Sequence, residues 1–181
     1  MTTDLQAGVL DAVDETSFRR AMSRFPTFVT VITAATPSGA VGCTATSVMS
    51  LSLRPPTLMV SLDSAGRTLG DVLSAGEFAV NVLSWRQRDL CRRFAAGDPR
   101  RRFDGVPHSA WDGVPVLDDA PATVVCRLGG TVPVLDHTLL IGTVRLTRTR
   151  PDDPLVLLDG VGHAVAAATD PDASEPRRAT S

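Results

Sequence analysis

A run of small hydroxyl side chains lies between two apolar segments of the chain, in the stretch GCTATSVMSLSLRPP at residues 42–56. Because alternate residues of a strand share a face, Thr44 and Thr46 point to one side, while Ser50 and Ser52 alternate with leucines. No charged residue occurs between Ala40 and Leu53, whereas a strand that faces solvent usually carries charged residues. Two interpretations remain open: an ordinary exposed strand, or an uncharged polar surface that binds a planar ligand rich in hydrogen-bonding atoms.

The segment SAGRT at 64–68 has the composition of a phosphate site. It follows a predicted strand that ends at Asp63 and opens a predicted helix at Arg67. The free N–H groups and the dipole of a helix N-terminus attract a phosphate, and Arg67 and Thr68 add a positive charge and a hydroxyl. A capped surface helix explains the same residues equally well. A flavin nucleotide would suit both segments, since its ring donates from N3–H and accepts at O2, O4 and N5.

Other arrangements of chemically active residues are less informative. The chain has no GxSxG or HExxH motif, and His108, His137 and His163 are isolated from one another. The three cysteines are far apart, so the sequence predicts neither a metal site nor a disulfide framework. The strongest local charge is a group of arginines at positions 92, 93, 100, 101 and 102. Few aromatic residues are interleaved with this group, so it favours a solvated surface over a nucleic-acid groove.

The overall composition indicates one ordinary globular domain. The chain has 181 residues, of which 43% are hydrophobic and 21% charged, and its net charge of −2 gives no reason to expect a nucleic-acid partner. We expect a cytoplasmic protein with reduced thiols, because neither a signal peptide nor a membrane-spanning run is recognisable. The predicted boundaries are a flexible arm at 1–13, the domain at 14–165 and a disordered tail at 166–181.

Periodicity predicts a mainly β protein with about three short helices. Phe18, Ala21, Met22 and Phe25 share one face of a helix that Pro26 ends. Two more helices are predicted at 67–76 and 85–95, and an irregular excursion at 96–121. Besides the stretch at 42–56, the predicted strands are 27–35, 57–63, 77–83, 122–130, 137–149 and a last one at 154–160. Most connections are too short for parallel crossovers, which favours an antiparallel barrel with helices packed outside.

The order and spacing of several segments resemble the flavin reductase-like family, whose members supply reduced flavin to two-component monooxygenases. The segments are FRRAMSRFPTFVTVITA (18–34), GCTATSVMSLSLRPP (42–56), FAVNVL (78–83), RFDGV (102–106), GVPVLDDAPATVVC (113–126) and LDHTLLIGTV (135–144). The resemblance implies a six-stranded antiparallel Greek-key split β-barrel with a few short flanking helices. It also implies a homodimer, with the flavin bound near the interface between the two subunits.

The resemblance also assigns individual residues to ligands. The flavin contacts that it implies, from the ring through the ribityl chain and phosphate to a nearby helix end, are Thr44, Ala45, Thr46, Ser47, Ser61, Leu62, Asp63, Arg67, Thr68, Arg93 and Phe94. His137 matches the histidine that lies beside the nicotinamide of the electron donor. Where the family usually has glycine, this chain has Leu135. We therefore expect bulk at this position to narrow the nicotinamide pocket or to alter the choice of donor.

The implied activity is that of an NAD(P)H:flavin oxidoreductase, with FMN or FAD as the flavin and NADH or NADPH as the donor. Hydride transfer between two stacked rings needs little acid–base chemistry from the protein. This agrees with a sequence in which no group of catalytic acid–base residues is recognisable. The implied partner is a separate flavin-dependent monooxygenase. A non-catalytic split barrel that carries or senses flavin or haem is the alternative, and it would have no need of His137.

Overall fold

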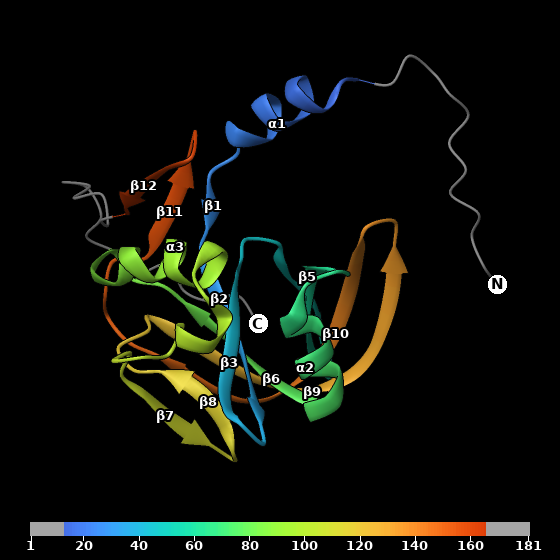
Figure 1. The fold of residues 1–181 in the computed structure, drawn as a ribbon, viewed down its shortest axis with the longest axis vertical. Helices are drawn as coiled ribbons and strands as arrows, with labels where there is room; N and C mark the ends of the chain where they lie inside the picture. Colours follow the sequence, from blue (N-terminus) through green and yellow to red (C-terminus); the bar gives the residue numbers. More distant parts are fainter. Residues whose placement is uncertain (1–12, 166–181) are drawn as a thin grey trace.

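The computed structural model describes residues 13–165 and is built mainly from antiparallel strands (Figure 1). The predicted arm, apart from Val13, and the predicted tail lie outside the described residues. Seven strands form the main sheet in the spatial order β3 (Gly39–Ala45), β2 (Thr30–Thr36), β6 (Glu77–Val82), β9 (Ala122–Val134), β10 (His137–Thr149), β5 (Pro56–Asp63) and β4 (Val48–Leu53). None of the helices within residues 13–165 has the length and apolar content that crossing a bilayer requires.

The main sheet curls back on itself, because its two outer strands are consecutive in the chain. Only Thr46 and Ser47 separate β3 from β4, and the Ser61 N–H donates to the Ser47 carbonyl at 3.0 Å. The predicted fold class, a mainly β barrel of antiparallel strands with short helices, is therefore confirmed. The sheet has seven strands where the resemblance implied six, because the hydroxyl-rich stretch forms two strands with a break between them.

The predicted helices are present, but the first one does not pack as expected. Helix α1 (Glu15–Ser23) begins at the N-cap Asp14, whose carboxylate accepts from the Ser17 N–H at 2.9 Å. Its apolar face is exposed: Phe18 is 58% accessible, and α1 stands away from the barrel in Figure 1. Periodicity identified the apolar face correctly but does not reveal what covers it.

Helices α2 (Arg67–Ala75) and α3 (Arg88–Ala96) pack against the barrel and border the same side of it. Gly76 ends α2 in the left-handed conformation at a φ of 69°, as the sequence predicted. The predicted third helix is divided into a 3-10 turn at Trp85–Gln87 and α3. Phe94 of α3 is fully buried. It belongs to a second apolar cluster beside the barrel core, and this packing fixes α3 against β3.

Two segments differ from the sequence-based expectation. The last predicted strand does not enter the main sheet: β11 (Leu155–Leu158) joins β1 (Thr27–Phe28) and β12 (Val161–Ala164) in a small separate sheet. The region predicted as irregular contains a hairpin of β7 (His108–Trp111) and β8 (Val114–Leu117). Asp112 and Gly113 form its turn with φ angles of 48° and 83°. An Asp-Gly pair between two short strands is a recognised hairpin signal that the sequence reading missed.

Candidate functional site

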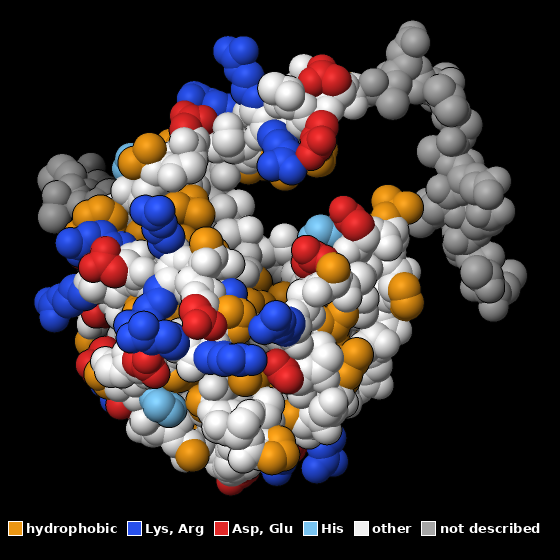
Figure 2. Space-filling view, in the orientation of Figure 1, with side chains coloured by type: hydrophobic (Ala, Val, Ile, Leu, Met, Phe, Trp, Pro, Cys, Tyr) orange, Lys and Arg blue, Asp and Glu red, His pale blue; other side chains and the backbone are white. Residues whose placement is uncertain are grey.

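A groove of about 550 Å³ opens between the ends of β3 and β5, the start of α2 and the side of α3. It brings together every predicted site residue except Arg93, although these residues come from separate segments of the chain. The residues that line it are Cys43, Thr44, Ala45, Thr46, Ser47, Ser61, Leu62, Asp63, Gly66, Arg67, Thr68, Leu69, Phe94, Ala95, Pro99, Arg102 and His137. Figure 2 shows basic side chains gathered on the face of the molecule that carries α2 and α3.

The hydroxyl groups along the groove divide into two kinds. The Thr44 hydroxyl donates to the Cys91 carbonyl at 2.7 Å and so ties β3 to α3. The hydroxyls of Thr46, Ser47 and Ser61 make no hydrogen bond to another residue within 13–165 and remain available to a ligand. Thr46 and Ser47 of the hydroxyl-rich stretch line the groove, whereas Ser50 and Ser52 do not.

The start of α2 is shaped as an anion site. The Asp63 carboxylate accepts from the Ala65 N–H at 2.8 Å, and its carbonyl accepts from the Gly66 N–H at 3.0 Å, which folds the turn that leads into the helix. The N-cap is Gly66, which has no side chain to cap the first turn. The Leu69 N–H donates to the Gly66 carbonyl at 3.1 Å, but no side chain caps the helix, so the N–H groups of Arg67 and Thr68 are left for a ligand. The exposed Arg67 adds a positive charge beside them.

The lining of the groove includes the thiol of Cys43. Burial raises the pKa of the Cys43 thiol, and this effect exceeds the opposing effects of the hydrogen bond with Thr68 and of the positive charge of Arg102. The thiol is therefore protonated at neutral pH and behaves as a small apolar group. The buried Thr68 contributes packing and a hydrogen bond to Cys43 at this end of the groove.

His137 lines the groove from the first position of β10, where it pairs with Asp63 of β5. Its Nδ1 is 2.8 Å from a carboxylate oxygen of Asp136, which leaves Nε2 to meet a ligand. The pKa of the Asp136 carboxyl lies below its usual value because of the hydrogen bond with His137 and the charge of His137. The Ser64 N–H donates to the Asp136 carbonyl at 2.9 Å and holds the turn before His137 against β5.

Arg93 is the one predicted site residue that does not line this groove. Its guanidinium donates to the carbonyl of Arg101 at 2.8 Å and to that of Asp104, and it faces a different cavity beside α3. Arg102 lines the groove and donates to the carbonyls of Gly42 at 2.8 Å and Gly97 at 3.2 Å. Arg102 begins the segment RFDGV at 102–106. The sequence assigned no role to it, because nothing local distinguishes it from Arg100 and Arg101.

Leu135 lies outside the groove. It occupies the turn between β9 and β10 at a φ of 54°, and 92% of its surface is accessible. It is absent from the residues that line the groove, so the expected narrowing of the pocket by its side chain is not seen.

A curled antiparallel sheet with a groove lined by small hydroxyl side chains, and with an uncapped helix start beside it, is typical of the class of flavin-binding split barrels. Comparison with known proteins makes the class specific. Residues 22–166 match the family described as flavin reductase like domain. The chain therefore belongs to that family, and the resemblance found from the sequence is confirmed.

Three relatives illustrate the match. The NADH-dependent flavin reductase StyB of Pseudomonas fluorescens is 40% identical over 144 residues, which cover 77% of this chain and 82% of StyB. The solved structure of flavin reductase PheA2 is 35% identical with a TM-score of 0.79, covering 86% of this chain and all of that one (100%). The styrene monooxygenase flavin reductase of Pseudomonas putida S12 is 32% identical with a TM-score of 0.73, covering 83% of this chain and 97% of that one. The predicted activity, flavin reduction with a nicotinamide donor, is confirmed at the level of the family.

Proposed function

We propose that the groove is the active site of an NADH:flavin oxidoreductase that supplies reduced flavin to a separate monooxygenase. The proposal rests chiefly on one observation. The segments at 44–47, 61–63 and 67–68, which the resemblance assigned to the flavin, and His137, which it assigned to the nicotinamide, line one groove of about 550 Å³. The names of the relatives support the donor and the kind of partner, since StyB is NADH-dependent and a solved relative belongs to a monooxygenase.

The residues of the groove fit a flavin nucleotide. Thr46, Ser47 and Ser61 offer small hydroxyls to the polar edge of a planar ring. The uncapped start of α2 and the Arg67 guanidinium hold the phosphate. When bound, a flavin accepts hydride at N5 from nicotinamide C4, and this chemistry belongs to the two cofactors. The protein binds, orients and separates them from bulk water.

His137 is the residue that distinguishes a reductase from a flavin carrier. With Nδ1 engaged by Asp136, Nε2 is the ring nitrogen left for a ligand in the groove that His137 lines. We assign this nitrogen to a hydrogen bond with the nicotinamide, which a carrier would not need. The exposed ring leaves space above the groove for a second planar group to enter, since 48% of the His137 side chain is accessible.

Two substitutions test this placement, because they should fail in different ways. Arg67→Ala should weaken FMN binding by about 1.5–3 kcal/mol, the contribution of a charge-assisted hydrogen bond, and leave riboflavin binding nearly unchanged. His137→Ala should raise the KM for NADH or lower kcat while flavin affinity stays the same. Arg92→Ala is the matched control, because Arg92 is an exposed arginine of α3 that does not line the groove.

The decisive assay follows the nicotinamide absorbance band after purified protein is mixed with flavin and NADH, or with NADPH in its place. Absence of oxidation above background with both donors would contradict the reductase activity and favour the carrier. Loss of flavin binding in His137→Ala, or equal loss of FMN and riboflavin binding in Arg67→Ala, would show that the two ligands are placed wrongly.

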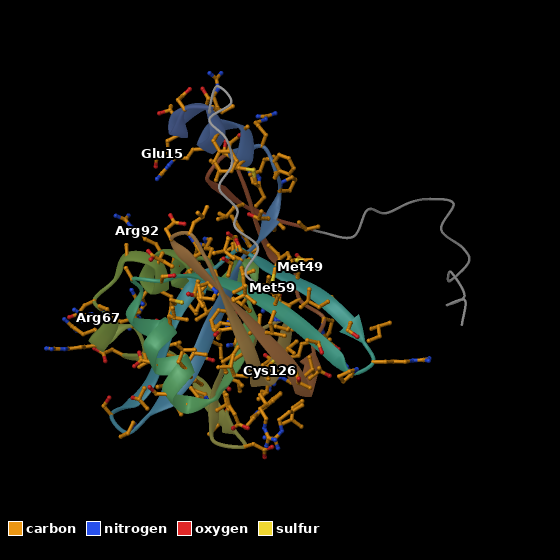
Figure 3. All side chains as sticks on the ribbon, turned by 90° about the vertical axis from the view of Figure 1, so that its right-hand side faces the viewer. Glu15, Met49, Met59, Arg67, Arg92 and Cys126 are labelled. Carbon is orange, nitrogen blue, oxygen red and sulfur yellow. The ribbon has the colours of Figure 1, made fainter. Side chains whose placement is uncertain are left out.

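The proposal includes a homodimer, in which two apolar surfaces of each subunit are covered. One is the exposed face of α1. The other is the outer side of β4, where Met49 and Leu53 are 52% and 83% accessible; Met49 pairs with Met59 of β5 (Figure 3). Surfaces of this kind mark protein contacts. Light scattering should give a dimer, and Met49→Asp should give a monomer of the same fold by circular dichroism. A wild-type monomer that is fully active would contradict this part of the proposal.

The predicted cytoplasmic location is part of the same proposal. The nicotinamide donor is regenerated in the cytoplasm, and a partner monooxygenase must meet reduced flavin before oxygen consumes it. Fractionation of cells that express the protein, with immunodetection in each fraction, tests the location directly.

A further inference from the structure

A second cavity of about 580 Å³ adjoins the groove at its phosphate end. The two cavities share Arg67, Thr68 and Pro99, so the second begins where the phosphate site of the first ends. Its full lining consists of Thr36, Pro37, Ser38, Ala40, Val41, Gly42, Arg67, Thr68, Asp71, Pro99 and Arg100. A ligand that fills the groove and extends past the phosphate therefore enters this second cavity.

Strand β3 forms one wall of both cavities, so the length of this strand gives their combined length. Residues 43–46 line the groove, and residues 40–42 line the second cavity. From Thr46 back to Ala40 the strand advances about 20 Å at roughly 3.3 Å per residue. A mononucleotide whose ring lies against Thr46 ends at its phosphate, beside Arg67 and Thr68. Only a dinucleotide has a second half that can lie along residues 40–42.

The lining of the second cavity has the chemistry of an adenylate site. Pro37, Pro99 and Val41 offer apolar surface to a planar base. Arg100 brings a positive charge next to the phosphate end, and Asp71 offers a carboxylate to ribose hydroxyls. Neither Arg100 nor Asp71 forms an ion pair with another residue of the described part of the chain, so both side chains remain available to a ligand.

We propose that the second cavity binds the adenylate half of FAD, and that this protein takes FAD in preference to FMN. The inference rests on the proposed function, because it extends a flavin whose ring and first phosphate occupy the groove. Arg67 and Arg100 then flank the pyrophosphate, and Asp71 meets the adenylate ribose.

The nicotinamide nucleotide also carries an adenylate, but its geometry fits the second cavity less well. Its nicotinamide lies at His137, which lines the groove and is absent from the second cavity. The adenylate of the donor would have to pass the flavin phosphate to reach Arg100. FAD reaches the same position along one continuous path.

Equilibrium titration of the protein with FAD, FMN and riboflavin in the absence of NADH tests the proposal without any turnover. The unsubstituted protein should bind FAD at least about tenfold more tightly than FMN, the factor that one additional charge-assisted hydrogen bond provides. Arg100→Ala should remove this advantage and leave FMN affinity unchanged. Arg101→Ala is the matched control, because Arg101 lies next to Arg100 but pairs with Asp104 and does not line the second cavity. Ser38→Trp, which fills the cavity from an exposed turn, should also abolish the preference.

The outcomes separate this inference from the proposed function. Equal affinity for FAD and FMN, or an unchanged ratio in both Arg100→Ala and Ser38→Trp, overturns the adenylate site and leaves flavin reduction intact. If Arg100→Ala instead raises the KM for NADH with FMN as the flavin, and FAD affinity does not change, the cavity holds the adenylate of the donor and the FAD assignment is wrong. If the unsubstituted protein binds no flavin at all, the proposed function fails together with it.

Discussion

The three cysteines make the stability of this protein unusually easy to interpret at alkaline pH. The chain has no tyrosine and no lysine, so its thiols are the only side chains that titrate between about pH 9 and pH 12. Burial raises the pKa of the Cys126 thiol to about 12, from 9.0 for an unperturbed thiol. Cys126 is fully buried in the barrel core, where a thiolate would be poorly solvated.

The sign of the effect follows from proton linkage. Above about pH 9 the unfolded chain releases the Cys126 proton while the folded chain keeps it, so the free energy of unfolding falls as the pH rises. The loss approaches about 1.4 kcal/mol per pH unit and reaches roughly 2.5 kcal/mol between pH 8 and pH 11. Burial also raises the pKa values of Cys43 and Cys91, so each of these thiols adds a smaller loss in the same direction.

Urea denaturation at several pH values between 8 and 11, under reducing conditions and followed by tryptophan fluorescence, measures this slope. Cys126→Ala should lower the stability at every pH, because it leaves a small cavity, but it should show a much flatter alkaline slope. Cys91→Ala is the comparison at a half-buried position. Parallel curves for the unsubstituted protein and Cys126→Ala would refute the assignment of the effect to a buried neutral thiol.

Two further substitutions test the packing that positions the groove. Gly142→Ala would place a Cβ 2.6 Å from the Phe78 ring and should destabilise the barrel by about 1–3 kcal/mol in urea denaturation, whereas Gly130→Ala, which has open space, should change little. Arg102→Ala removes the hydrogen bond to Gly42 of β3 and the one to Gly97 at the end of α3, and it should lower both the melting temperature and flavin affinity. Unchanged flavin affinity in Arg102→Ala would mean that the position of α3 does not shape the groove.

Much of the fold was predictable from the sequence, because local patterns carry the signals for individual elements. The period-2 runs gave the long strands, and Gly76 marked the end of α2 by a conformation that glycine adopts without strain. The hairpin at Asp112–Gly113 carried an equally local signal that was overlooked. The order and spacing of the motifs also predicted the family, which the comparison confirmed.

The site was predictable as a set of residues but not as a geometry. The resemblance assigned Thr46, Ser47 and Arg67 to the flavin and His137 to the nicotinamide, and these four residues do line one groove. It did not show that the Thr44 hydroxyl is engaged by α3, because that bond joins residues separated by 47 positions in the chain.

Only the tertiary structure decided between arginines that look alike in the sequence. The orientation of α3, fixed by the burial of Phe94, turns Arg93 toward the carbonyls of the following loop. The same loop brings Arg102 back to the groove and Arg100 to the second cavity. Which charge reaches a ligand depends on how a helix and a loop pack against the barrel, and no local pattern of residues encodes that arrangement.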